Sequence, residues 1–163
     1  MTGASISIDA KIMWITHSMP ISPLSVLKAK LHLALSITLL PSLMLSTACV
    51  ILMPIGVLDA ICVTVGTAAF VAFMALFGLC VNICLPKFDW ASETVAIKQS
   101  ASTLVTMFAP FVLIVPAVII AYVTESYSLV MYAFTALIVI LNILIYLWLY
   151  RKGAEKYSRL CGA

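Results

Sequence analysis

Four long apolar stretches, separated by short polar or proline-containing breaks, dominate the pattern of the chain. A helix of about 20 mainly apolar residues crosses the hydrocarbon core of a bilayer. Helices also satisfy their own backbone hydrogen bonds, which lipid cannot do. The stretches that meet this length are 31–53, 60–85, 102–122 and 129–150. The pattern therefore predicts an all-α polytopic membrane protein with about four transmembrane helices within a region of residues 31–150.

The breaks between these stretches predict two helical hairpins. Pro54-Ile55-Gly56 separates the first pair, and Thr124-Glu125-Ser126 turns the chain between the last pair. Proline and glycine are typical of such turns because they end helices. Pro86 stops the second stretch and opens a loop that we expect to span residues 86–101.

Composition supports a lipid environment. Of the 163 residues, 64% are hydrophobic and 9% are charged, against roughly a quarter charged in soluble domains. The formal net charge is only +3, and the basic residues lie beside apolar runs, so a nucleic-acid partner is not expected.

The positions of the basic residues predict the orientation in the membrane. Cytoplasmic segments of membrane proteins carry the excess of Lys and Arg. All nine basic residues fall before the first stretch, between the second and third, or after the fourth: Lys11, Lys28, Lys30, Lys87, Lys98, Arg151, Lys152, Lys156 and Arg159. The two opposite turns carry only the acids Asp59 and Glu125. We therefore expect a cell-membrane protein with both termini cytoplasmic, ending in a basic tail, residues 151–163.

Within the stretches, few residues suggest chemistry. Asn82 and Asn142 are the most polar side chains there, and each is a candidate either for lining a substrate path or for helix packing. Ala68, Ala72, Ala75 and Gly78 form a small-residue face, which we interpret as a packing seam. Three prolines interrupt the stretches, as hinges or as static kinks: Pro41, Pro110 and Pro116.

The segment before the first stretch, residues 1–30, predicts a short cytoplasmic amphipathic helix. Apolar residues share one helical side at Ile8, Ile12, Ile15 and Met19, and Pro20 ends the pattern. Ser22-Pro23 then has the form of a helix cap followed by proline at the first helical position, which starts a second helix leading into the membrane. The amphipathic helix is either an interfacial anchor or a docking element for a soluble partner.

Two polar stretches resemble a family, the ABC-2 type permeases, which are membrane subunits of ATP-binding-cassette transporters. In the first stretch, the resemblance is carried by Asp9, Trp14, Pro20-Ile21-Ser22 and Lys30. The second is LPKFDWASETVAIKQSAS, residues 85–102, with its Lys-Phe-Asp-Trp and Lys-Gln-Ser elements. The family's unit has six membrane helices, so this chain looks like the C-terminal part, supplying the last four.

The resemblance implies a function and partners. It implies that the segment containing Asp9, Lys11, Trp14 and Pro20 acts as a coupling helix that sits in a groove of a separate ATPase subunit. It also implies assembly with another permease half or with a second copy, and export as the direction of transport.

Other classes of function fit the sequence less well. The chain has no G-x-x-x-x-G-K-[ST] phosphate loop, so its energy would come from the partner ATPase, and no cofactor is expected. His17 and His32 stand without an acid-rich or cysteine-rich cluster, so we do not expect an enzyme. Cys80 and Cys84 share a helical face without a further ligand. A non-transporting membrane scaffold or assembly factor remains the alternative function.

Overall fold

The computed structural model describes residues 22–86, 100–153 and 156–157. Four helices in this part of the chain are long and apolar enough to cross a membrane, which confirms the predicted all-α polytopic fold. They are α3 (Pro23–Leu52), α4 (Val57–Cys84), α6 (Ala101–Thr124) and α7 (Tyr127–Trp148), and α7 continues into a π-helical turn, η3 (Leu149–Gly153).

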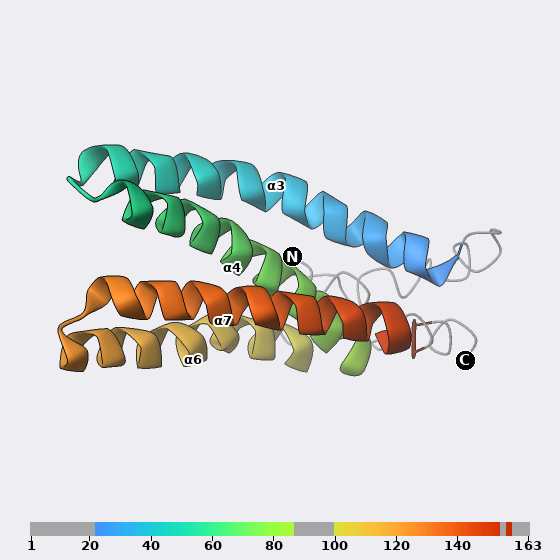
Figure 1. Ribbon diagram of the computed structural model, residues 1–163. Coiled ribbons are helices and arrows are strands. Elements are labelled where there is room, and N and C mark those ends of the chain that lie inside the picture. Colours follow the sequence, from blue (N-terminus) through green and yellow to red (C-terminus); the bar gives the residue numbers. More distant parts are fainter. Residues whose placement is uncertain (1–21, 87–99, 154–155, 158–163) are drawn as a thin grey trace.

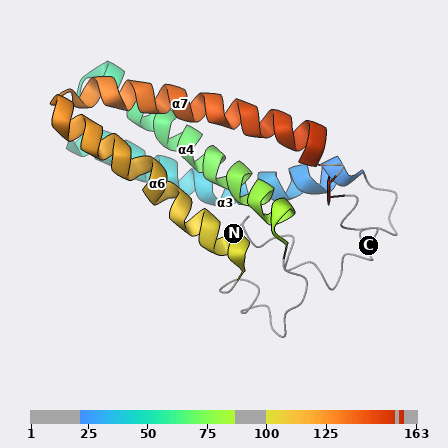
Figure 2. The same ribbon diagram turned by 90° about the horizontal axis from the view of Figure 1, so that it is seen from below.

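Helix α4 is the centre of the bundle, because it packs against α3, α6 and α7. Successive helices run in opposite directions, so the starts of α3 and α6 lie at the same end of the bundle as the ends of α4 and α7 (Figure 1). In the perpendicular view, α4 runs between α6 and α7, with α3 beyond it (Figure 2). Helices α4 and α7 are therefore parallel neighbours that come from different hairpins.

Helices α3 and α6 both begin at this end, and a capping serine in the local sequence fixes where each of them starts. The Ser22 hydroxyl accepts a hydrogen bond from the backbone N–H of Ser25, and proline follows the cap, as the Ser-Pro pair predicted. The Ser100 hydroxyl accepts in the same way from the N–H of Thr103 and caps α6. A side-chain oxygen at this position satisfies a backbone donor that the helix itself leaves open.

The helices extend beyond several of the predicted span limits. Helix α3 begins at Pro23, whereas the apolar stretch begins near residue 31, and α4 begins at Val57 rather than near residue 60. The reason is that hydropathy marks only the lipid-covered part, while a helix continues through the headgroup layer until a cap or a turn ends it. Residue 30 lies inside α3, in agreement with the expectation that a helix starting at Ser22-Pro23 leads into the membrane.

Helices α3 and α6 continue through all three internal prolines. Nearby hydroxyl groups bond back to main-chain carbonyls, as where Thr106 Oγ1 donates to the carbonyls of Ser102 and Thr103, 2.9 Å from each. None of the three prolines ends a span.

The hairpin turn after α6 is made by Glu125, which has the left-handed value of φ, 51°.

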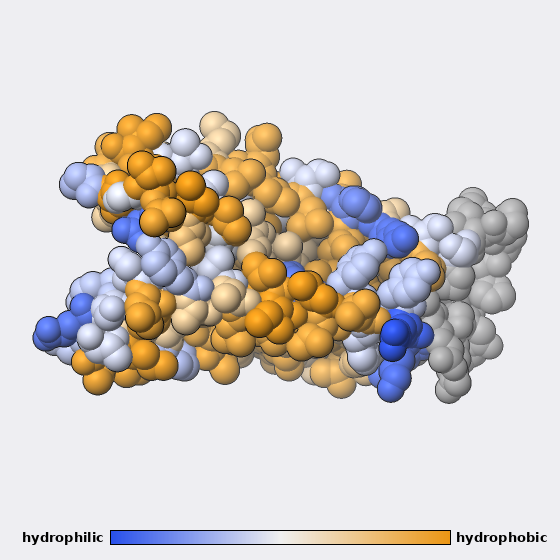
Figure 3. Space-filling model, viewed as in Figure 1, coloured by the Kyte–Doolittle hydropathy of each residue, from blue (hydrophilic) through white to orange (hydrophobic). Residues whose placement is uncertain are grey.

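The bundle keeps its apolar surface on the outside. Large side chains along every membrane helix are exposed, up to 82% at Leu52, and hydrophilic residues gather at the two ends of the molecule (Figure 3). An apolar surface of this extent needs lipid around it, because soluble proteins cover all but small patches. The chain is thus a multi-pass membrane protein.

A compact core lies at the end where α3 begins. It joins residues of α3, α4 and η3 with Tyr157: Leu27, Leu31, Ala75, Leu76, Leu79, Ile83, Leu149 and Tyr157. Leu27, Leu79 and Ile83 are completely buried. This core holds the first hairpin against the end of α7.

Candidate functional site

Polar contacts between α4 and α7 occur in a single register. Tyr132 Oη donates a hydrogen bond to Asp59 Oδ1 at 2.6 Å. About one turn further along, Cys62 Sγ lies 3.5 Å from Thr135 Oγ1. About two turns beyond that contact, Asn142 Nδ2 donates to the carbonyl oxygen of Ala69 at 2.8 Å. Each pair is separated by 73 residues in the sequence, which is possible only if the two helices run parallel without slipping. We call these residues the α4–α7 interface.

Helices α4 and α7 also lie close together at Gly66. A Cβ atom added there would lie 2.8 Å from Thr135 Oγ1, a distance that real Cβ atoms essentially never show. The absence of a side chain at Gly66 therefore makes room for Thr135. Small residues at membrane-helix interfaces allow backbones to approach in this way.

Phenylalanine rings continue the packing beside these polar contacts. The rings of Phe70 and Phe134 join the two helices, with centroids 6.2 Å apart. Along α4, Phe73 stacks on Phe77 at 5.6 Å. These separations are within the range at which aromatic pairs attract one another.

The two predicted polar candidates lie at different depths. Asn142 donates to Ala69 and also to the carbonyl of Ile138 on its own helix at 3.0 Å, so its amide is used for helix packing. Asn82 lies completely buried beside Leu79 and Ile83 near the end of α4. Because Asn82 is thirteen residues beyond Ala69, the two amides are separated by about 20 Å along α4. The structure does not bring them together into one site.

The small-residue face of α4 takes part in packing over half its length. Ala75 and Gly78 are buried, and Ala75 belongs to the core that includes Leu27 and Leu31 of α3. Ala68 and Ala72 are half-buried. This part of the face is a contact between helices, in agreement with the prediction of a packing seam.

The residues predicted to contact an ATPase lie outside the described residues. These are Asp9, Lys11, Trp14 and Pro20. The same holds for most of the second stretch that carries the family resemblance, of which residues 85, 86 and 100–102 are described.

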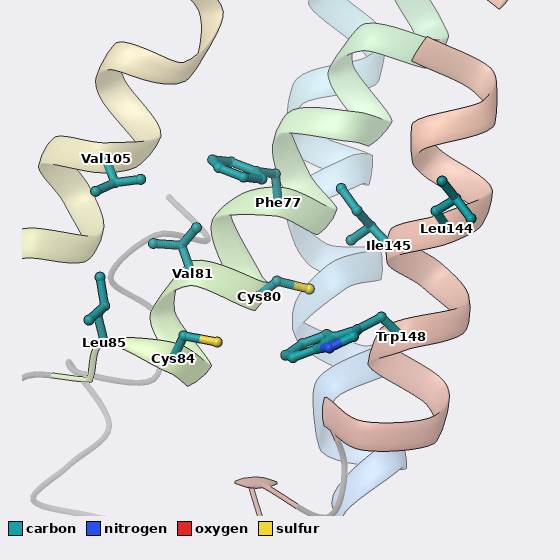
Figure 4. A pocket seen from close by; sticks show the side chains of 9 residues that line it. All are labelled: Phe77, Cys80, Val81, Cys84, Leu85, Val105, Leu144, Ile145 and Trp148. Atoms are coloured by element: carbon teal, nitrogen blue, oxygen red, sulfur yellow. The ribbon is translucent and has the colours of Figure 1, made fainter. Parts of the chain in front are cut away.

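A cavity of about 430 Å³ opens between α4, α6 and α7 near the end where α4 and α7 finish. Its walls are apolar or thiol side chains, which Figure 4 shows in place: Phe77, Cys80, Val81, Cys84, Leu85, Val105, Leu144, Ile145 and Trp148. Cys80 and Cys84 both line it, and they therefore share one face of α4, as their spacing predicted. Among the described residues, no group of three or more His, Cys, Asp and Glu lies close enough to hold a metal ion.

Charge is divided between the two ends of the described part. Its basic residues lie where α3 begins and where α7 finishes: Lys28, Lys30, Arg151, Lys152 and Lys156. Lys28 Nζ stands 5.9 Å from the centre of the Tyr150 ring, within reach of a cation–π contact between these two helix ends. The acids Asp59 and Glu125 lie at the other end, at the start of α4 and the end of α6.

Sequence reasoning missed the α4–α7 interface itself. A signal was present on α7, because Tyr132, Thr135 and Asn142 recur at spacings of three and seven residues and so share one helical face.

Comparison of the chain with protein-family models, with curated proteins and with solved structures gives no match.

Proposed function

We propose that this chain is a permease subunit, or the C-terminal part of one, of an ABC-2 type transporter that takes its energy from a separate ATPase. In this proposal it lies in the cell membrane with both termini in the cytoplasm. It exports its substrate together with another permease half or a second copy of itself.

The observation that supports this proposal most is the position of two serine caps. The Pro-Ile-Ser element of the first resembling stretch ends at Ser22, and the Lys-Gln-Ser element of the second ends at Ser100. Each of these serines caps a membrane helix, α3 and α6, at the same end of the bundle. Both stretches therefore lead directly into membrane helices from one side, as segments that pass motion from an ATPase to the membrane would need to do.

Helix α6 supplies a second argument, since it offers a surface for a further membrane subunit. Its apolar side chains are exposed along most of its length, including Met107, Phe111 and Val112 at 61–70% exposure. Such a face suits lipid, and it also suits the other half of a permease.

The alternative, a non-transporting scaffold, is favoured by one observation. The polar side chains of the α4–α7 interface are engaged with each other or with the backbone, as Asn142 is with Ala69. Polar side chains that serve only helix packing are not available to line a path for a substrate.

An experiment at Trp14 separates the two proposals. A photo-crosslinking amino acid at this position, in the full chain in its native membrane, is expected to capture a protein with a nucleotide-binding phosphate loop. Asp9→Lys, Lys11→Glu and Trp14→Ala should each lower copurification of that ATPase without affecting membrane insertion. Glu125→Ala, at the opposite end, serves as the control and should leave copurification unchanged. Recovery of no ATPase would favour the scaffold, and equal recovery with all variants would count against docking of the ATPase at this segment.

A further inference from the structure

The cavity between α4, α6 and α7 lies at the basic end of the bundle. Cys84 is the last residue of α4 and Trp148 is the last of α7, and both line the cavity. The indole of Trp148 reaches across from α7 toward the Cys84 and Cys80 side chains of α4 (Figure 4). Since the walls are apolar, the occupant must present hydrocarbon to them. The volume of about 430 Å³ is within the range of about 300–1,000 Å³ typical of small-molecule sites.

Two cations follow Trp148, one of the residues that line this cavity, by three and four positions. Arg151 and Lys152 lie in the π-helical turn after Trp148, and both side chains are exposed. A Cβ atom added to Gly153 would lie 3.6 Å from Cζ3 of Trp148, so the turn folds back against the indole ring. The cations are thereby held within one turn of the cavity wall.

Among the described residues at this end, no acidic side chain neutralises Arg151 or Lys152. The acids of the described part, Asp59 and Glu125, lie at the opposite end of the bundle. The side chains of Arg151 and Lys152 form no hydrogen bond or ion pair within the described ranges. The Trp148 indole N–H likewise has no acceptor there.

We propose that this cavity binds one acyl chain of an anionic phospholipid, with the lipid phosphate held by Arg151 and Lys152. The apolar walls match the chain, and the pair of cations matches a headgroup with net negative charge. Tryptophan at the membrane interface lies at the level of the headgroups, where its N–H meets lipid oxygens. Basic pockets between membrane helices favour anionic lipids for the same reason. This proposal does not depend on the proposed transport function.

Trp148 itself provides the probe for a test. The chain has three tryptophans, so Trp14→Phe and Trp90→Phe leave Trp148 as the sole tryptophan. This protein is reconstituted in phosphatidylcholine vesicles that contain a minor fraction of a lipid brominated on its acyl chains, either phosphatidylglycerol or phosphatidylcholine. Each basic residue near an anionic lipid surface contributes roughly fivefold in affinity. We expect brominated phosphatidylglycerol to quench Trp148 at least about fivefold more strongly than brominated phosphatidylcholine.

Variants separate a built site from general attraction to the membrane surface. Arg151→Gln with Lys152→Gln should reduce the quenching by phosphatidylglycerol to the phosphatidylcholine level, while Arg151→Lys with Lys152→Arg keeps the preference. Val81→Phe, or Val105→Phe from the facing helix, fills the cavity and should also remove the preference. Unchanged Trp148 emission in unbrominated vesicles shows that a variant retains its fold. Equal quenching by the two lipids in the parent protein would overturn the proposal, as would a preference that persists in the glutamine or cavity-filled variants.

Discussion

The side-chain amide of Asn142 on α7 donates a hydrogen bond to the main-chain carbonyl of Ala69 on α4, at 2.8 Å in the apolar middle of the bundle. Because the acceptor belongs to the backbone, this bond reports the position of α4 and does not depend on which side chain stands at residue 69. It ties the second hairpin to the first at a depth where no water competes for the amide. The oxygen of the same amide, Asn142 Oδ1, is buried and accepts no hydrogen bond from a donor in the described part of the chain.

Replacement of Asn142 should weaken the association of the two hairpins. Asn142→Ala removes the interhelical bond, and we expect the free energy of unfolding to fall by about 1 kcal/mol, as for other hydrogen bonds between membrane helices. Asn142→Leu should lose less, because leucine keeps the volume and removes the buried, unpaired oxygen. Unfolding in mixed detergent micelles measures both. Ile140→Ala, on the lipid-exposed side of α7, is the control, and a larger loss there than in Asn142→Ala would contradict this prediction.

Gly66 should tolerate no side chain while Thr135 is present. The added Cβ of Gly66→Ala would meet Thr135 Oγ1 at 2.8 Å, and overpacking of this kind costs about 1–3 kcal/mol. Thr135→Ala removes the opposing hydroxyl and methyl groups. The double variant should therefore be more stable than Gly66→Ala alone. A double-mutant cycle of unfolding free energies measures this coupling, and purely additive effects would show that the two residues do not meet.

The number of membrane helices and the start of α3 followed from the sequence because each depends on local features. Twenty apolar residues predict a span whatever surrounds it, and Ser22-Pro23 predicts a helix start because the cap bonds to a residue three positions away. Hydropathy alone gave span limits shorter than some helices, as at α4, which begins at Val57 and not near residue 60, since lipid contact ends before the helix does.

The partners of the intramembrane polar residues did not follow from the sequence. Asn142 was recognised as either a packing residue or part of a path, and only the placement of α7 along α4 shows that its amide meets Ala69. Gly66 looks no different in sequence from any other small residue of α4, because its role depends on Thr135, more than sixty residues away. The register between helices of different hairpins is a tertiary property that a helical pattern does not contain.

The parallel register of α4 and α7 predicts a specific disulfide. Thr135→Cys places a thiol opposite the native Cys62, whose sulfur lies 3.5 Å from the threonine oxygen. With the other native cysteines replaced by serine, mild oxidation in membranes should form this bond, seen as a faster-moving band that reduction reverses. Leu137→Cys, which is 48% exposed on α7, is the matched control and should not react with Cys62. Equal crosslinking at both positions would mean that α7 does not keep this register.

The separation of charge between the two ends predicts which residues face the outside of the cell. Segments rich in Lys and Arg stay in the cytoplasm, so the end with Arg151 and Lys152 should be inside and the turn at Glu125 outside. In a chain whose native cysteines are replaced by serine, Glu125→Cys should react with a membrane-impermeant maleimide in intact cells. Arg151→Cys should react only after the cells are permeabilised. Both side chains are exposed in the structure, so a lack of reaction at either position would reflect the membrane barrier and not burial. The reverse pattern would invert the orientation and would place the predicted coupling segment on the side where no ATPase has access to ATP.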